Sequence, residues 1–274
     1  MRTSLCSDNN EYVSGKFYPN LYIRLTTACN ASCPFCNKDK HIINIDLKAL
    51  EALLIEMKTK DVPFSRISIT GGEPLLIPSL FEETTSLIFS IFPDADLTVN
   101  TNGYNLTKIK IDKRISGIHI SRHHFDNFIN NCLFGFDTIK KEDIISLSKN
   151  YKKQIRLNCL LIKSYIDSKN SIYQYLETFN DLYKIGFVSL MPINEYSVSH
   201  FVDFKDIAFD ERVLITSSKA NISKLKIKNC ECSNFLFVQK NGKITQGYMR
   251  QVCNLRQKET AALVFEGNSL KGSF

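Results

Sequence analysis

The feature that most constrains the fold is a regular alternation of short apolar segments with longer amphipathic ones. The short segments have the length of buried strands, and the longer ones repeat apolar residues three and four apart, as on one face of a helix. Asp46 is a suitable N-cap for the first of these helices. Six strands are predicted at residues 21–27, 66–70, 97–100, 117–121, 154–161 and 187–191, with helices at 47–58, 79–92, 140–150 and 172–184. Strands that alternate with helices pair in parallel through right-handed crossovers, so the chain is predicted to be an α/β protein.

The alternation ends after Pro192, and the last third of the chain is predicted to be rich in β-strands. Asn241-Gly242 is its strongest hairpin signal. Short strands are predicted at residues 213–216, 225–228, 235–240 and 243–246. We therefore divide the chain into an N-terminal extension (1–19), an α/β domain (20–195) and a small β-rich C-terminal appendage (196–274).

The composition is that of a globular protein, with 43% hydrophobic and 23% charged residues, which excludes a disordered chain, a collagen-like repeat and a coiled coil. No apolar run approaches the ~18–20 residues of a membrane span, and the N-terminus lacks the apolar stretch of a secretory signal. We therefore expect a cytoplasmic protein that does not bind membranes. The net charge of +7 favours anionic ligands, but its basic residues are spread too thinly for us to expect a nucleic-acid partner.

Three of the nine cysteines, Cys29, Cys33 and Cys36, lie in the string CNASCPFC. In a reducing compartment such clustering indicates metal binding rather than disulfides. A structural zinc site takes four ligands, and His41 could supply the fourth. An iron–sulfur cluster is usually held by four thiolates, and with only three one iron stays open to an exogenous ligand. The spacing alone leaves both interpretations open.

Polar strings follow the predicted strands at the end where parallel α/β proteins bind their ligands. CNASCPFC follows the first strand, TGGEP the second, NTNG the third and SRHHFD the fourth. Arg156-Leu157-Asn158 lies on the fifth strand, and Met191-Pro192 closes the sixth. Because these ends meet at one edge of a parallel sheet, we expect a single site there.

The motifs CxxxCxxC and GGEP, in register on successive strands, make residues 20–192 resemble the radical S-adenosylmethionine (SAM) enzymes. A zinc site would not account for GGEP or NTNG. The resemblance implies a partial (βα)6 barrel of the TIM type. It also implies that Cys29, Cys33 and Cys36 ligate three irons of a [4Fe–4S] cluster, whose fourth iron is chelated by SAM.

The same resemblance implies a set of SAM-binding residues. The backbone of Phe35 would contact the adenine, and GGEP would hold the methionine moiety, where glycines permit close approach and a carboxylate suits an ammonium group. Ser121 would reach the ribose or the carboxylate. The full cofactor-binding set is Phe35, Gly71, Gly72, Glu73, Pro74, Asn102, Ser121, Asn158 and Met191.

Enzymes of this family cleave SAM reductively to methionine and a 5′-deoxyadenosyl radical, which takes a hydrogen atom from the substrate. The resemblance therefore implies an enzyme that receives electrons from a flavodoxin or ferredoxin. His123, His124 and Asp126, just past the fourth strand, are candidate catalytic residues for acid–base work or substrate orientation, although adjacent histidines in a loop are often surface residues.

Within the family, IRLNCLLIKSYIDSKNSI and FVSLMPI are similar to segments of the molybdenum-cofactor branch, which includes the GTP cyclases. CECSNFLFVQKNGKIT is similar to the stretch that carries a second cluster there, so Cys230, Cys232 and Cys253 are candidate ligands of an auxiliary [4Fe–4S] cluster. A zinc site or simple burial are the alternatives for these three. The CxC spacing, Gly247 at the expected third cysteine and the ending SLKGSF depart from the pattern. We therefore do not predict a true GTP cyclase.

The leading hypothesis is a biosynthetic radical SAM enzyme that acts on a small anionic metabolite such as a nucleotide derivative. The second hypothesis is peptide modification. Only about twenty residues precede the first strand, fewer than a leader-binding domain needs, so a separate partner would bind the leader. The third is a non-catalytic zinc-binding module.

Overall fold

A computed structural model of the chain describes residues 20–36, 41–61, 66–151, 155–180, 182, 184–190, 194–202, 213–216, 219–222 and 263–271. Several predictions fall outside these residues. They are the N-terminal extension, the strands at 225–228, 235–240 and 243–246, and the site residues Met191, Cys230, Cys232 and Cys253.

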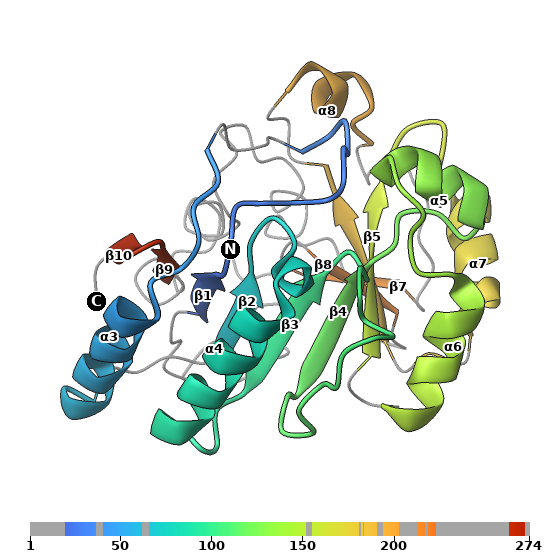
Figure 1. The fold of residues 1–274 in the computed structure, drawn as a ribbon. Helices are drawn as coiled ribbons and strands as arrows, with labels where there is room; N and C mark the ends of the chain where they lie inside the picture. Colours follow the sequence, from blue (N-terminus) through green and yellow to red (C-terminus); the bar gives the residue numbers. More distant parts are fainter. Residues whose placement is uncertain are drawn as a thin grey trace, which may run out of the picture.

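Six parallel strands form the centre of the molecule, in the order in which they occur along the chain (Figure 1). They are β1 (Asn20–Arg24), β2 (Arg66–Thr70), β3 (Leu97–Thr101), β4 (Gly117–Ser121), β5 (Ile155–Leu161) and β6 (Lys184–Ser189). The prediction of six parallel strands is confirmed, with β2 and β4 at the predicted bounds.

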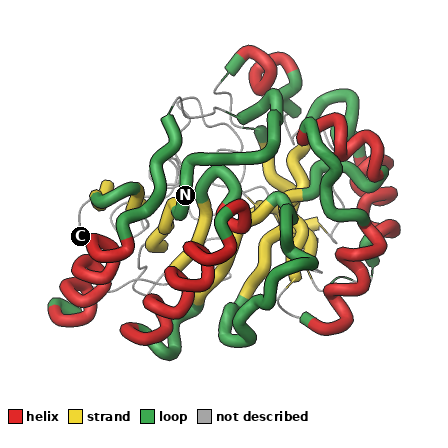
Figure 2. The backbone as a smooth tube through the Cα atoms, viewed as in Figure 1, coloured by secondary structure: helices red, strands yellow, loops and turns green. Residues whose placement is uncertain are grey.

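Helices cover one face of this sheet, as the red tubes beside the yellow strands of Figure 2 show. The described helices are α3 (Leu47–Thr59), the 3-10 turn η1 (Pro74–Leu76), α4 (Pro78–Ile91), α5 (Asn127–Phe134), α6 (Lys141–Asn150) and α7 (Lys169–Thr178), together with α8 (Glu195–Ser199), which lies off this face. The Asp46 carboxylate caps α3 as predicted, accepting hydrogen bonds from the Lys48 and Ala49 amides. The predicted helix at 172–184 is wrong at both ends. Ser168 caps α7 in a capping box, and β6 already begins at Lys184.

The two faces of the sheet differ in chemistry. On the helix side, alternate strand residues such as Ile23, Ile69, Val99, Ile120 and Leu157 are fully buried in the main hydrophobic core. Because side chains alternate across a strand, the residues between them project from the opposite face. That inner face is polar, and it is described with the site.

The described parts of the C-terminal region extend both edges of the same sheet. At one edge β8 (Lys219–Ile222) pairs antiparallel with β6, and β7 (Val213–Thr216) pairs with β8, so the strand predicted at 213–216 is confirmed. At the other edge β9 (Leu263–Glu266) pairs in parallel with β1, and β10 (Ser269–Lys271) pairs with β9. Among the described residues, no helix is long and apolar enough to cross a membrane.

Candidate active site

The cysteine loop, residues 29–36, follows β1 at the carboxyl end of the sheet, and the GG pair after β2 packs against the chain that leads into it. The Gly72 amide donates to the Thr26 carbonyl (2.7 Å) and the Glu73 amide to the Ala28 carbonyl (2.8 Å). A Cβ at Gly71 or Gly72 would clash with the same two carbonyls. Both glycines are therefore required for this close approach of two backbones.

The middle of the cysteine loop is held by the end of α5. The Ser32 amide donates to the Phe134 carbonyl (2.7 Å), and Gly135, with φ of 73°, ends the helix in the left-handed region. A Cβ at Gly135 would collide with the Ser32 hydroxyl. This helix was not predicted, and it fixes the loop between Cys29 and Cys33.

The last turn of the cysteine loop is held by α8, which lies beyond the carboxyl ends of the strands at the top of Figure 1. The Asn194 amide group donates to the Pro34 carbonyl (3.0 Å), and the Ser197 hydroxyl donates to the Phe35 carbonyl (3.4 Å). A second hydrophobic cluster, built on Ala31, Leu133, Phe134, Ile162 and Leu190, packs against Cys29, Cys33 and Phe35. The loop is thus positioned by three neighbouring elements and shielded from water on one side.

Glu73 ties the end of β2 to the end of β3. Its buried carboxylate accepts hydrogen bonds from the Thr101 hydroxyl (2.6 Å), the Asn102 amide (2.6 Å) and the Leu75 amide (3.0 Å). Burial raises its pKa to about 7, although these three donors favour the charged form. Both carboxylate oxygens therefore have protein partners, and the next residue, Pro74, is buried at the start of η1.

Ser121 and Asn158 lie side by side at the carboxyl ends of β4 and β5, where they are paired in register. The Asn158 Oδ1 atom is buried and has no hydrogen-bond partner among the described residues. Such an acceptor costs about 1–3 kcal/mol unless something donates to it, so a ligand with hydroxyl or amino groups fits this place. SAM carries both kinds of group.

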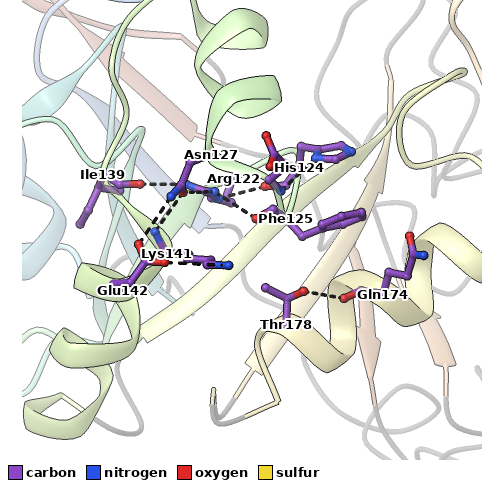
Figure 3. A network of polar contacts seen from close by, with 10 residues as sticks. Arg122, His124, Phe125, Asn127, Ile139, Lys141, Glu142, Gln174 and Thr178 are labelled. Atoms are coloured by element: carbon purple, nitrogen blue, oxygen red, sulfur yellow. Dashed lines mark hydrogen bonds and ion pairs between the residues drawn. The ribbon is translucent and has the colours of Figure 1, made fainter.

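The loop after β4 is organised by Arg122, a fully buried residue that the sequence analysis did not single out (Figure 3). Its guanidinium donates to the carbonyls of His124 (2.9 Å), Ile139 (2.8 Å) and Phe125 (3.3 Å) and to the Asn127 side chain (2.6 Å). The five donors of an arginine in one plane suit this set of backbone acceptors. Arg122 therefore fixes the shape of the loop that carries both histidines.

The three candidate catalytic residues of that loop have different surroundings. His123 is buried between Phe134, stacked at 4.9 Å between ring centroids, and Phe35, edge-on at 5.2 Å. Burial lowers the pKa of His123 to about 3, so it is neutral, and its Nδ1 accepts from the Leu160 amide. His124 Nδ1 accepts from the Asp126 amide, and Asp126 is the exposed N-cap of α5. Among the described residues, His123 is the only one of these three whose side chain makes a ring contact with the cysteine loop, and it does so through Phe35.

The donor set of the cysteine loop suits an iron–sulfur cluster, because thiolates are its usual ligands. Cys29 and Cys33 are half-buried and Cys36 is exposed. The Ala31 amide donates to Cys29 Sγ (3.4 Å). Within the described ranges no three His, Cys, Asp or Glu side chains stand ready-made as a metal site. The loop backbone is held by its neighbours, as the hydrogen bonds to Ser32, Pro34 and Phe35 show.

The inner face of the sheet places polar side chains below the cysteine loop. In register across three strands lie Asn100, His119 and Arg156, and His119 Nδ1 pairs with Asn100 Oδ1 at 3.2 Å. Arg156 is only 7% exposed, and its Nε and Nη2 atoms have no partner in the described part of the chain. Burial, and then the charge of Arg66, lowers its pKa to about 10, so it is still a cation at neutral pH.

These features agree with the comparisons to known proteins. The model of the Radical SAM superfamily matches residues 23–191. The chain therefore belongs to the radical SAM superfamily and is an enzyme whose cofactors are a [4Fe–4S] cluster and SAM. The alternative of a non-catalytic zinc module does not hold.

Two of its curated relatives are GTP 3′,8-cyclases. It is 24% identical to the "Probable GTP 3′,8-cyclase" of Methanococcus aeolicus over 214 residues, covering 75% of this chain and 70% of that protein. It is 30% identical to the GTP 3′,8-cyclase of Trichodesmium erythraeum over 190 residues, covering 63% of this chain. The chain spans only 56% of the length of the second protein. The predicted similarity to this branch is thus confirmed.

Among solved structures, Streptococcus suis SuiB bound to S-adenosylmethionine matches with a TM-score of 0.50 and 20% identity. The match covers 66% of this chain and 43% of that one. It confirms the predicted partial barrel.

Proposed function

We propose that this radical SAM enzyme acts on a small anionic metabolite bound in the inner face of the barrel. The observation that carries the proposal is Arg156, a buried cation without a partner among the described residues. An unpaired buried charge costs several kcal/mol, and an anionic ligand would offset that cost. Arg156 lies two residues before Asn158 on β5, about 7 Å from it along the strand, so a substrate held there would lie just below the cofactor.

We further propose that Cys29, Cys33 and Cys36 hold the cluster. When bound, the cluster and SAM supply the radical that takes a hydrogen atom from the substrate. The chain's own residues do the remaining work. The GG pair, Ser32 and α8 fix the cysteine loop, while the second hydrophobic cluster keeps water from it.

The proposed SAM-binding set keeps the backbone of Phe35, the GGEP segment, Asn102, Ser121, Asn158 and Met191. Asn158 has the strongest support in it, because its buried oxygen lacks a donor among the described residues. Glu73 is proposed to act by holding the GG pair and Asn102 in place, since both of its oxygens already have protein donors. For His123 we propose contact with the bound cofactor or substrate as a neutral ring.

The ligand proposal is tested with Cys33→Ala in anaerobically purified protein. We expect the variant to lose about four of the irons that the parent holds per chain, together with loss of 5′-deoxyadenosine release under reductant. The exposed Cys132→Ala variant on α5 is the matched control and should keep both. Iron and 5′-deoxyadenosine release that are unchanged in Cys33→Ala would contradict the assignment.

The substrate proposal is tested with Arg156→Met and GTP as an anionic probe. Because hydrogen bonds to a charged group contribute about 1.5–3 kcal/mol, calorimetry on the holoenzyme should show binding at least about tenfold weaker in the variant. Guanosine, which lacks phosphate, should bind weakly to both proteins. The charge-matched control is Lys108→Met on the exposed surface.

Two outcomes of these measurements would contradict the substrate proposal. It would be contradicted if Arg156→Met bound GTP, the other nucleoside triphosphates and sugar phosphates as the parent does. It would also fail if only peptides, and no anionic metabolite, increased 5′-deoxyadenosine release, in which case the enzyme would modify peptides.

We also propose an auxiliary cluster on Cys230, Cys232 and Cys253, supported by the similarity of CECSNFLFVQKNGKIT to the second-cluster stretch of the molybdenum-cofactor branch. About eight irons per chain would support it, and about four would remove it. A flavodoxin or ferredoxin is proposed as the electron donor, and the cytoplasm as the location, because clusters of this kind need a reducing compartment.

A further inference from the structure

The orientation of the Asn102 side chain is dictated by its neighbours. The Asn102 backbone amide is bound by Glu73, and its side-chain Oδ1 accepts from the Tyr104 amide (2.9 Å). Since a backbone N–H can only donate, the oxygen of the Asn102 amide must face Tyr104. Its Nδ2 therefore faces the cysteine loop, 3.0 Å from Asn30 Oδ1 and 3.9 Å from Cys29 Sγ.

This arrangement also fixes Asn30, the residue that follows Cys29. Because Asn30 Oδ1 faces Asn102 Nδ2, its own Nδ2 must point the other way. That Nδ2 is buried and has no acceptor among the residues that the structure describes. A buried amide donor left unpaired costs about 1–3 kcal/mol, so an acceptor is required at this point of the cysteine loop.

We propose that Asn30 donates this hydrogen bond to a sulfur of the cluster and that Asn102 is the positioning residue that aims it. The inference rests on the proposed cysteine ligands. Hydrogen bonds to cluster sulfurs are one of the factors that set the reduction potential. They stabilise the reduced state more, because it carries one more negative charge. The chain Glu73, Asn102, Asn30 thus links the GGEP segment to the ease with which the cluster accepts an electron.

The test is the midpoint potential of the cluster in the holoenzyme, measured without SAM by a redox titration followed by electron paramagnetic resonance. Asn30→Leu removes the donor at similar size and without new charge. We expect its ratio of reduced to oxidised cluster to fall about tenfold at a fixed potential, which is 59 mV for a one-electron couple. Asn30→Asp keeps the acceptor for Asn102 but lacks the donor, so it should shift in the same direction.

Asn102→Leu tests the positioning role. It should lower the potential in the same direction, and its effect should be smaller when Asn30→Leu is already present, because the part that acts through Asn30 is then lost. The effect that persists in the double variant measures the direct contact of Asn102 Nδ2 with Cys29 Sγ (3.9 Å). Asn150→Leu, at the exposed end of α6, is the matched control and should leave the potential unchanged.

The outcomes separate this inference from the ligand proposal. A parent protein without iron would overturn the ligand proposal itself. An iron content equal to that of the parent with an unchanged potential in Asn30→Leu would overturn the present inference alone. If Asn30→Leu lost its iron, Asn102→Leu, which adds no charge, would decide. A potential that stayed constant while the affinity for SAM fell would show that Asn30 serves SAM, which also overturns the inference.

Discussion

At the scale of single residues, Glu73 combines burial with three hydrogen-bond donors. Its pKa lies at about 7 in the folded protein instead of 4.5 because burial disfavours the charged carboxylate. A carboxyl whose pKa is raised by folding binds more protons in the folded state, so its contribution to stability falls as pH rises through this interval.

This gives a prediction for Glu73→Gln, which cannot titrate. Between pH 4.5 and about 7, the free energy of unfolding of the parent should fall relative to that of the variant, by at most about 3 kcal/mol. Urea unfolding across this range measures the difference, with Glu82→Gln on the exposed side of α4 as the control. Parallel pH profiles for the parent and Glu73→Gln would show that the carboxyl does not titrate in this interval.

The roles of Asp126 and Arg122 show what sequence reasoning lacks at this scale. Asp126 is a candidate catalytic residue beside two histidines, and the structure adds that its carboxylate caps α5. The capping role could have been inferred from the Asn127–Phe134 segment that follows. One partner of Arg122, the Ile139 carbonyl, lies beyond α5, and no local pattern reveals that contact. The same applies to the Asn30–Asn102 pair, whose members lie on different loops.

At the scale of elements, the short helix α5 stabilises the cysteine loop through its last residues. Gly135→Ala should lower the free energy of unfolding for two reasons. An L-residue in the left-handed region costs about 1–2 kcal/mol, and its Cβ would collide with the Ser32 hydroxyl. Urea unfolding and iron content measure the two effects. We expect lower stability and fewer irons per chain in this variant.

The Ser32→Ala substitution separates the two costs. In the double variant with Gly135→Ala, the collision with the hydroxyl is removed, and the backbone cost and a tight contact with the Cβ of residue 32 (3.1 Å) should persist. Ser32→Ala alone should be nearly neutral, since it loses only a 3.5 Å contact with the Phe134 carbonyl. If the double variant were as unstable as Gly135→Ala, packing against Ser32 would not be the reason for the glycine.

Sequence patterns predicted most of the elements that bury a continuous apolar stripe, such as α3, α4 and the six parallel strands. They failed for α5, whose sequence NFINNCLF is rich in weak helix formers and depends on packing against the second hydrophobic cluster. They also overextended α7, because Leu182 continues the apolar spacing although it lies beyond the helix. Periodicity reports burial, and burial alone does not tell where a helix ends.

At the scale of the whole molecule, β9 and β10 extend the sheet beyond β1, so that β1 is not an edge strand. The Gly267 carbonyl in their turn also accepts from the Asp46 amide at the start of α3 (2.7 Å). The hairpin was not predicted, although the Gly267-Asn268 turn signal was available. Its pairing with β1 joins distant parts of the chain and leaves no local pattern.

Deleting residues 263–274 should therefore leave β1 as an open edge strand. We expect a lower urea midpoint and concentration-dependent association, because an uncovered edge invites pairing with other chains. A deletion of residues 272–274, which lie after β10, is the control and should change neither property. Light scattering and urea unfolding measure both. Equal behaviour of the two deletions would mean that β9 contributes nothing to the sheet.

The pairing of β9 with β1 has a consequence for folding during synthesis on the ribosome. β1 is the first of these strands to leave the ribosome, whereas its outer neighbour β9 follows only after all the other parallel strands. Until β9 has emerged, the nascent polypeptide therefore carries an unpaired edge strand right beside the cysteine loop, and contacts between such remote parts form slowly. The outer pairing of β1 thus depends on the synthesis of β9 rather than on the folding of any one βα unit.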